Sequence, residues 1–135
     1  MIALLCQLRQ KIGPASDQQA RALAMKQQNQ LWRACQAIRQ RDLDLAERLL
    51  RTRPTSLPPN ATYWNLMGLL AEAQGDWNTA RRHWQRALRT NRHHSPAERN
   101  LRRYFEFYEW GWSEYLPAFG DEIEYGILRN KELSS

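Results

Sequence analysis

The chain has 135 residues, of which 42% are hydrophobic and 25% are charged, so its composition excludes an intrinsically disordered protein and fits one globular domain. Its formal net charge of +6 is unevenly placed: residues 1–103 hold 18 Lys and Arg against 7 Asp and Glu, whereas residues 104–135 hold 2 against 7. The chain therefore combines a basic body with an acidic tail.

The first predicted helix is short and lies before Gly13-Pro14. Four apolar residues recur in it at helical spacing: Ile2, Leu5, Leu8 and Ile12. A segment this short, with no basic residue before it, is neither a secretion signal nor a membrane span. Gly13-Pro14 ends this helix, and Ser16 and Asp17 start a long second helix with one apolar face that extends to about Gln40.

Three further helices with polar caps are predicted. Asp42 caps a helix that ends before Pro54, and residues 54–59 form a rigid loop rich in proline. Asn60 caps a helix over residues 61–74. Gly75-Asp76 ends that helix and caps the next one, over residues 77–92.

Ser95 is predicted to start the last helix through a capping box. Ser95 is the cap, Pro96 occupies the first helical position and Glu98 the third. Aromatic and apolar residues then recur at helical spacing: Leu101, Tyr104, Phe105, Tyr108, Trp112 and Tyr115. We expect four of them to seal the end of the domain against water: Leu101, Phe105, Tyr108 and Trp112.

The sequence repeats with a period of 34 residues. Four pairs align within nine residues: Asp42 with Asp76, Leu43 with Trp77, Ala46 with Ala80 and Leu50 with Trp84. A helix–turn–helix unit of this length resembles the tetratricopeptide repeat, whose pattern is W-x2-L-G-x2-Y, then A-x3-F, then P. The residues that fit the pattern lie within 61–94: Trp64, Met67, Gly68, Gly75, Asp76, Trp77, Ala80, Trp84, Ala87 and Leu88.

The resemblance implies an all-α fold, a right-handed superhelix of the tetratricopeptide type, in one domain over residues 1–135. We divide it into an N-terminal helical segment (1–26), two repeats (27–60 and 61–94), a capping helix (95–118) and an acidic tail (119–135). In the second repeat, small residues let two helices approach while tryptophans fill the space between them. The predicted repeat core is Trp64, Met67, Gly68, Trp77, Ala80, Trp84 and Ala87.

In tetratricopeptide proteins the first helix of each repeat lines a concave groove that binds a partner. By this resemblance seven residues would face the groove here: Arg39, Asn65, Leu69, Glu72, Arg99, Arg103 and Glu106. Arginine dominates this set, which favours acidic side chains or a carboxylate in the partner. Family members that hold a C-terminal carboxylate use a Lys and Asn set, which is not reproduced at the matching positions: Leu31, Cys35, Leu66, Pro96 and Asn100.

We therefore expect a non-enzymatic protein–protein interaction module, such as an adaptor, scaffold or assembly factor, that needs no cofactor or metal. The sequence has no recognisable nucleophile–base pair or metal motif and no glycine-rich phosphate loop, and its three histidines are expected to be solvated. Cys6 and Cys35 are expected to be buried thiols, which points to a reducing compartment such as the cytoplasm.

Two other functions remain open. Arginines along the second helix of each repeat could form a footprint for nucleic acid: Arg48, Arg51, Arg53, Arg81, Arg82, Arg86, Arg89 and Arg92. Against this reading, the aromatic residues are expected at core positions, where they would not interleave with these arginines as stacking platforms. The chain could also be a regulatory fragment of a larger multidomain protein.

The acidic tail offers a further possibility. Glu122 and Glu124 lie beside Ile123 and Tyr125, which could serve as anchors. Such a segment could occupy the chain's own groove and compete with a partner, or occupy the groove of a second copy and form a homo-oligomer. A tail that only aids solubility is the simpler alternative.

Overall fold

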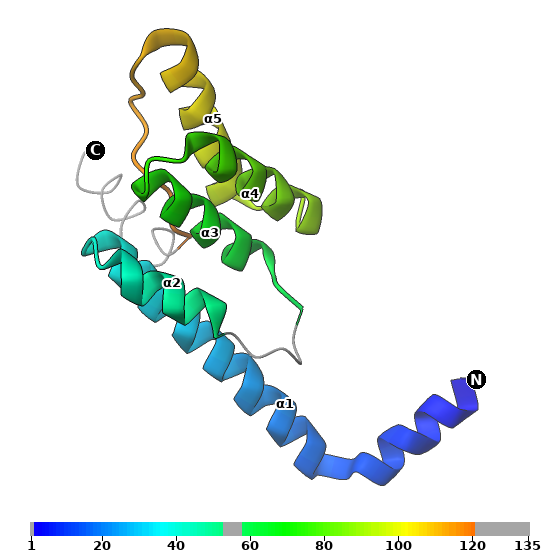
Figure 1. The fold of residues 1–135 in the computed structure, drawn as a ribbon. Helices are drawn as coiled ribbons and strands as arrows, with labels where there is room; N and C mark the ends of the chain where they lie inside the picture. Colours follow the sequence, from blue (N-terminus) through cyan, green and yellow to red (C-terminus); the bar gives the residue numbers. More distant parts are fainter. Residues whose placement is uncertain (1, 53–57, 121–135) are drawn as a thin grey trace, which may run out of the picture.

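The computed structural model describes residues 2–52 and 58–120, with side chains from Asp17 onward, and in these residues it contains helices and no strands. Five helices follow one another: α1 (Ile2–Arg39), α2 (Leu43–Arg51), α3 (Ala61–Ala73), α4 (Trp77–Thr90) and α5 (Ser95–Trp110). α1 pairs with α2 and α3 with α4, while α5 packs against α4 (Figure 1). α3 contacts each of the other four helices, so the core is built around it. The predicted all-α fold is confirmed.

The N-terminal helix differs from the predicted pair of helices separated at Gly13-Pro14. α1 continues through these residues from Ile2 to Arg39, and it bends in its N-terminal part (Figure 1). Because Pro14 has no N–H to donate, one helical hydrogen bond is lost there, which favours a bend where the helix continues on both sides. Some predicted features lie outside the described residues: the side chains of Ile2, Cys6, Leu5, Leu8 and Ile12, most of the loop 54–59, and the tail beyond Gly120.

The turns of the α1–α2 and α3–α4 pairs have the same geometry. Arg41 and Gly75, which occupy equivalent positions, both have left-handed backbone angles, with φ of 62° and 85°. The Asp after each of them donates its amide to a carbonyl of the preceding helix, at 2.8 Å for Asp42 and 2.9 Å for Asp76. Each Asp side chain then caps the following helix. The sequence repeat is therefore also a repeat of backbone geometry.

Close packing of large and small residues holds α3 against α4. The Trp84 side chain is fully buried, as are Ala80 and Ala87 on the same face of α4. A Cβ atom on Gly68 would overlap the Trp84 indole, so only glycine allows this approach. The Trp84 Nε1 atom donates to the Asn65 carbonyl at 3.3 Å. The other predicted core residues are partly buried against this centre: Trp64, Met67 and Trp77.

α5 begins one residue earlier than predicted. Its N-cap is His94, whose side chain makes no capping hydrogen bond, and Ser95 is already helical. The predicted capping box is therefore wrong, because a Ser within the first turn does not have the extended backbone from which a cap accepts. Pro96 still lies in the first turn, where the helix needs no N–H from it.

The aromatic residues of α5 also face differently from the prediction. Three of the four residues expected to seal the end are exposed: Phe105 at 53%, Tyr108 at 84% and Trp112 at 60%. α5 contacts the core through Ala97, Tyr104 and the fourth predicted residue, Leu101. The rings of Tyr104 and of the partly exposed Phe107 lie 6.2 Å and 5.2 Å from Trp77. One face of α5 packs on α4, and a second face contacts residues 111–120, which follow α5 in the chain. The third face of α5 therefore stays in solvent.

Candidate functional site

Residues 111–120, here called the return segment, run back from the end of α5 beside α3 toward α1 (Figure 1). Gly111 starts it with a left-handed φ of 78°, which ends α5. The segment is exposed near its middle, where Leu116 is 82% accessible, and buried at Ala118, which is 2% accessible. Its tightest anchor therefore lies close to its end.

Two asparagine side chains from different helices hold the backbone of Ala118. Asn65 of α3 and Asn100 of α5 are fully buried, and their Nδ2 atoms donate to the Ala118 carbonyl at 2.9 Å and 2.8 Å. The Ala118 amide donates to Asn100 Oδ1 at 2.9 Å, and Asn100 Nδ2 also donates to Asn65 Oδ1 at 2.8 Å. Buried amides need such partners, so this pair, the asparagine clamp, favours a main chain at this place.

A buried ion pair supports the clamp. Arg103 Nη2 lies 2.5 Å from Glu72 Oε1, and the two side chains are only 5% and 14% exposed. Arg103 Nη1 also donates to Asn100 Oδ1 at 2.9 Å. Burial raises the pKa of the Glu72 carboxyl above its ordinary value, and the charge and hydrogen bond of Arg103 oppose this rise. Arg103 therefore orients Asn100, and its charge is paired inside the protein.

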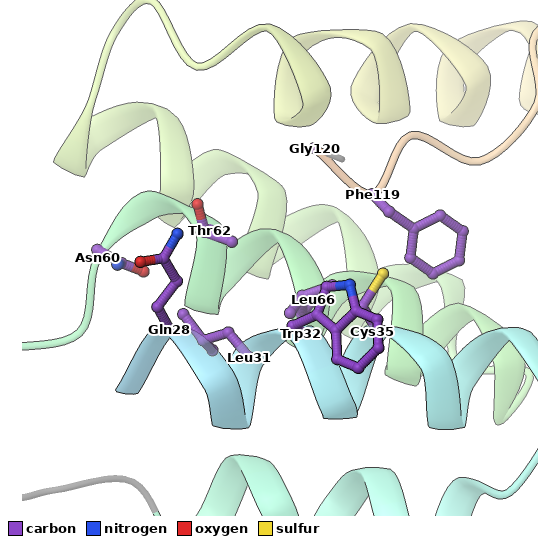
Figure 2. A pocket seen from close by; sticks show the side chains of 9 residues that line it. All are labelled: Gln28, Leu31, Trp32, Cys35, Asn60, Thr62, Leu66, Phe119 and Gly120. Atoms are coloured by element: carbon purple, nitrogen blue, oxygen red, sulfur yellow. The ribbon is translucent and has the colours of Figure 1, made fainter. Parts of the chain in front are cut away.

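Phe119 lies between two hollows of the groove that α1 and α3 form. The guanidinium carbon of Arg39 lies 4.2 Å from the centre of its ring. One cavity, of about 330 Å³, opens between Trp32, Leu66 and Phe119 (Figure 2). The other, of about 250 Å³, lies between Arg39, Pro117 and Phe119. Residues 117–120 thus fill the middle of the groove and leave space on both sides.

Six of the seven residues predicted to face a groove lie beside the return segment: Arg39, Asn65, Leu69, Glu72, Arg99 and Glu106. The seventh, Arg103, lies behind the clamp, where it bonds to Asn100 and Glu72. Leu69 and Glu72 line the cavity beside Pro117. Glu106 accepts a hydrogen bond from Ser113 Oγ at 2.9 Å. Arg99 lies apart from the others, in a hollow of about 480 Å³ beside Tyr115.

Asn100 was not among the residues predicted to face the groove, although it forms half of the clamp. That position was compared only with the carboxylate-binding set of the family, whereas the structure pairs Asn100 with Asn65, 35 residues earlier. The recurrence of Asn at almost the same place in two successive first helices was the signal that could have found it. The charge pattern pointed to the acidic residues after Phe119 as the segment that enters the groove. The residue that the clamp holds is instead Ala118, which precedes Phe119.

The arginines of α2 and α4, here called the basic face, differ from the expectation that they do not interleave with aromatic rings. The guanidinium carbon of Arg86 lies 4.2 Å from the centre of the Trp64 ring, and that of Arg81 lies 5.6 Å from Tyr104. His83 stacks on Trp64 with a centroid distance of 5.7 Å and is half-buried, and burial lowers its pKa. Trp64 is thus covered by Arg86 and His83.

The described side chains include no recognisable centre for metal chemistry. Within residues 17–52 and 58–120, no three His, Cys, Asp or Glu side chains lie where they could share a metal ion. Cys35 is a buried thiol that accepts from Arg39 Nη1 at 3.4 Å. In the same part of the chain, no helix is both long and apolar enough to cross a lipid bilayer.

Comparison with known proteins gives one finding. Residues 61–94 match the family model described as the tetratricopeptide repeat. This stretch comprises α3, α4 and their turn, and it carries Asn65, Glu72 and Trp84. No curated protein and no solved structure matches the chain. The family match shows a tetratricopeptide repeat over residues 61–94 of an all-helical fold, and repeats of this kind are typical of protein–protein interaction modules.

Proposed function

We propose that this repeat protein binds an extended segment of another protein in the groove between α1, α3 and α5, as an adaptor, scaffold or assembly factor. The asparagine clamp carries the proposal, because it bonds a main-chain carbonyl and a main-chain amide. Every extended polypeptide offers these two groups, so the clamp suits a peptide of many sequences. The cavities beside Phe119 provide room for its side chains.

We further propose that the partner segment is acidic. Arg41 is exposed at the smaller cavity, and Arg99 and Arg102 line the hollow beside Tyr115. Guanidinium groups at these places would pair with carboxylates of a bound segment. Because these arginines lie outside the clamp, we expect them to act more on association rate and selectivity than on the final affinity.

Selection from a random peptide library displayed on phage tests both proposals. The full chain should enrich peptides rich in Asp and Glu, and the Arg41→Ser/Arg99→Ser variant should bind them several-fold more weakly. Arg82→Ser/Arg89→Ser is the matched control, since it removes the same charge from exposed positions of α4 and should keep the binding. Equal loss in both variants would show that net charge, not the groove, selects the peptides.

The basic face is tested in the same experiment with a random single-stranded oligonucleotide. We expect weak binding, because Arg86 and His83 already cover the Trp64 ring. Tight oligonucleotide binding that falls linearly with the logarithm of salt concentration, and that the Arg82→Ser/Arg89→Ser variant loses, would favour a nucleic-acid-binding protein instead.

A further inference from the structure

We propose that residues 117–120 are a built-in ligand: they occupy the partner groove through the asparagine clamp, and the partner displaces them with an extended segment that carries a small residue followed by an aromatic one. This inference rests on the proposed function and deepens it. It identifies the kind of sequence that the groove binds and a competitor that limits access to it.

The contacts at the clamp define the first position. Ala118 is bound only through its main-chain carbonyl and amide, and it is 2% exposed. A longer side chain has no room where the residue is so enclosed between α3 and α5. The clamp therefore accepts any main chain, provided that the residue at its centre is small.

The contacts of Phe119 define the second position. Its ring packs against the hydrophobic core and lies under the Arg39 guanidinium, at 4.2 Å from the ring centre. A flat apolar ring suits both partners, because its edge can bury apolar area while its face attracts a cation. Gly120 follows with a left-handed φ of 102°, so the bound chain turns directly after the aromatic residue.

The arrangement around residues 117–120 indicates that another chain can replace them. The cavities of about 330 Å³ and 250 Å³ on the two sides of Phe119 show that the built-in segment fills only part of the groove. The segment is also joined to α5 by a largely exposed stretch, in which Trp112 is 60% and Leu116 82% accessible. Release therefore has to break the hydrogen bonds of the clamp, the contacts of Phe119 and the hydrogen bond between Ser113 and Glu106.

A labelled synthetic peptide with the sequence of residues 113–120, SEYLPAFG, tests the inference by fluorescence anisotropy. We expect the full chain with Phe119→Ser to bind this peptide about tenfold more tightly than the unaltered chain, as for a site that is self-occupied about nine-tenths of the time. Phe105→Ser is the matched control, because it removes an exposed aromatic residue of α5 and should leave the affinity unchanged. A peptide with Ser in place of its Phe should bind neither chain.

Circular dichroism shows whether the Phe119→Ser chain remains helical. A second chain, with a protease recognition sequence inserted between Glu114 and Tyr115, avoids any change in the groove; cleavage and dilution should release the segment and create binding of the labelled peptide. Equal affinity of the altered and unaltered chains, no binding by a helical Phe119→Ser chain, or unfolding on cleavage would each overturn the inference.

The outcome also separates this inference from the proposed function. If library-selected acidic peptides bind and need Arg41 and Arg99, but SEYLPAFG fails to bind the opened chain, the groove is a peptide site and residues 117–120 are only part of the fold. If neither kind of peptide binds, both proposals fail together.

Discussion

α3 is packed in two different ways at contacts one helical turn apart, here called its apolar side and its polar side. On the apolar side, Gly68 brings the helix against the buried indole of Trp84, and the fit depends on the shapes of apolar groups. On the polar side, Asn65 meets Asn100 across the backbone of Ala118, and the fit depends on hydrogen bonds. Shape complementarity ties two particular helices together. Hydrogen bonds to a main chain can be made equally well by another main chain, so this side can exchange its occupant.

The largest expected loss of stability comes from a substitution on the apolar side of α3. Gly68→Leu should lower the free energy of unfolding by about 3 kcal/mol or more, because a Cβ at this position already overlaps the Trp84 ring. Urea denaturation measures it. Gln85→Leu adds the same side chain at an exposed position of α4 and should change stability by less than about 0.5 kcal/mol. Equal stability of Gly68→Leu and the unaltered chain would show that α3 and α4 do not pack as described.

The next effect comes from the polar side and depends on pH. Arg103→Met removes the cation that faces the largely buried Glu72, and it should cost about 2 kcal/mol at pH 8, somewhat less than for a fully buried pair. The pKa of Glu72 is already raised by burial, and the loss of Arg103 raises it further. A carboxyl with a raised folded-state pKa stabilises the fold below its unfolded-state pKa and loses this contribution as the pH rises through the folded-state value.

The deficit of Arg103→Met should therefore be smaller at pH 5 than at pH 8. Urea titrations at both values measure it, and the Glu72→Gln/Arg103→Met chain should show little dependence on pH over this range. The same deficit at both values would mean that Arg103 stabilises the fold through packing rather than through its charge.

A smaller effect tests the repeated turn. Arg41 has a left-handed backbone where the equivalent residue of the next pair is Gly75. Arg41→Gly should therefore raise the free energy of unfolding by about 0.5 kcal/mol, because glycine adopts this conformation without steric cost. Gly75→Arg should lower it by about 1 kcal/mol. Thermal or urea unfolding measures both, and destabilisation by Arg41→Gly would argue against equivalent turns.

The smallest effect concerns the exposed face of α5. Tyr108→Ser should change stability by less than about 0.5 kcal/mol, because its side chain is 84% accessible. Tyr104→Ser should cost more, about 1 kcal/mol, since Tyr104 packs on Trp77. Urea denaturation of the two variants compares them directly. A larger loss of stability for Tyr108→Ser than for Tyr104→Ser would instead support the sequence prediction that Tyr108 seals the end of the domain.

The apolar side of α3 could be predicted from the sequence, because small and large residues recur there with the helical period and the 34-residue repeat. This pattern alone was enough to predict that Gly68, Ala80 and Trp84 lie in the core. The helix limits at Asp42 and Asp76 followed from local capping chemistry. These features depend on neighbours within one helical hairpin, and such neighbours are visible in sequence spacing.

The polar side could be predicted only in part. Most of the residues predicted to face a groove lie beside residues 111–120, but no local pattern in the sequence shows where this extended segment returns to the helices. The predicted orientation of α5 was also wrong, because the exposed Phe105 and Tyr108 are as apolar as Tyr104, which packs on the core. Which face of an aromatic helix is buried depends on the position of α4 and of the return segment.

Amide hydrogen exchange at Ala118 gives the most direct test of an exchangeable occupant. The Ala118 amide donates to Asn100 Oδ1, whereas the Trp84 amide lies within α4. In the unaltered chain, Ala118 should exchange through local opening, faster than Trp84, and a saturating concentration of SEYLPAFG should accelerate Ala118 alone. Exchange of both amides at one common rate, or an Ala118 rate that the bound peptide leaves unchanged, would contradict an exchangeable segment in the groove.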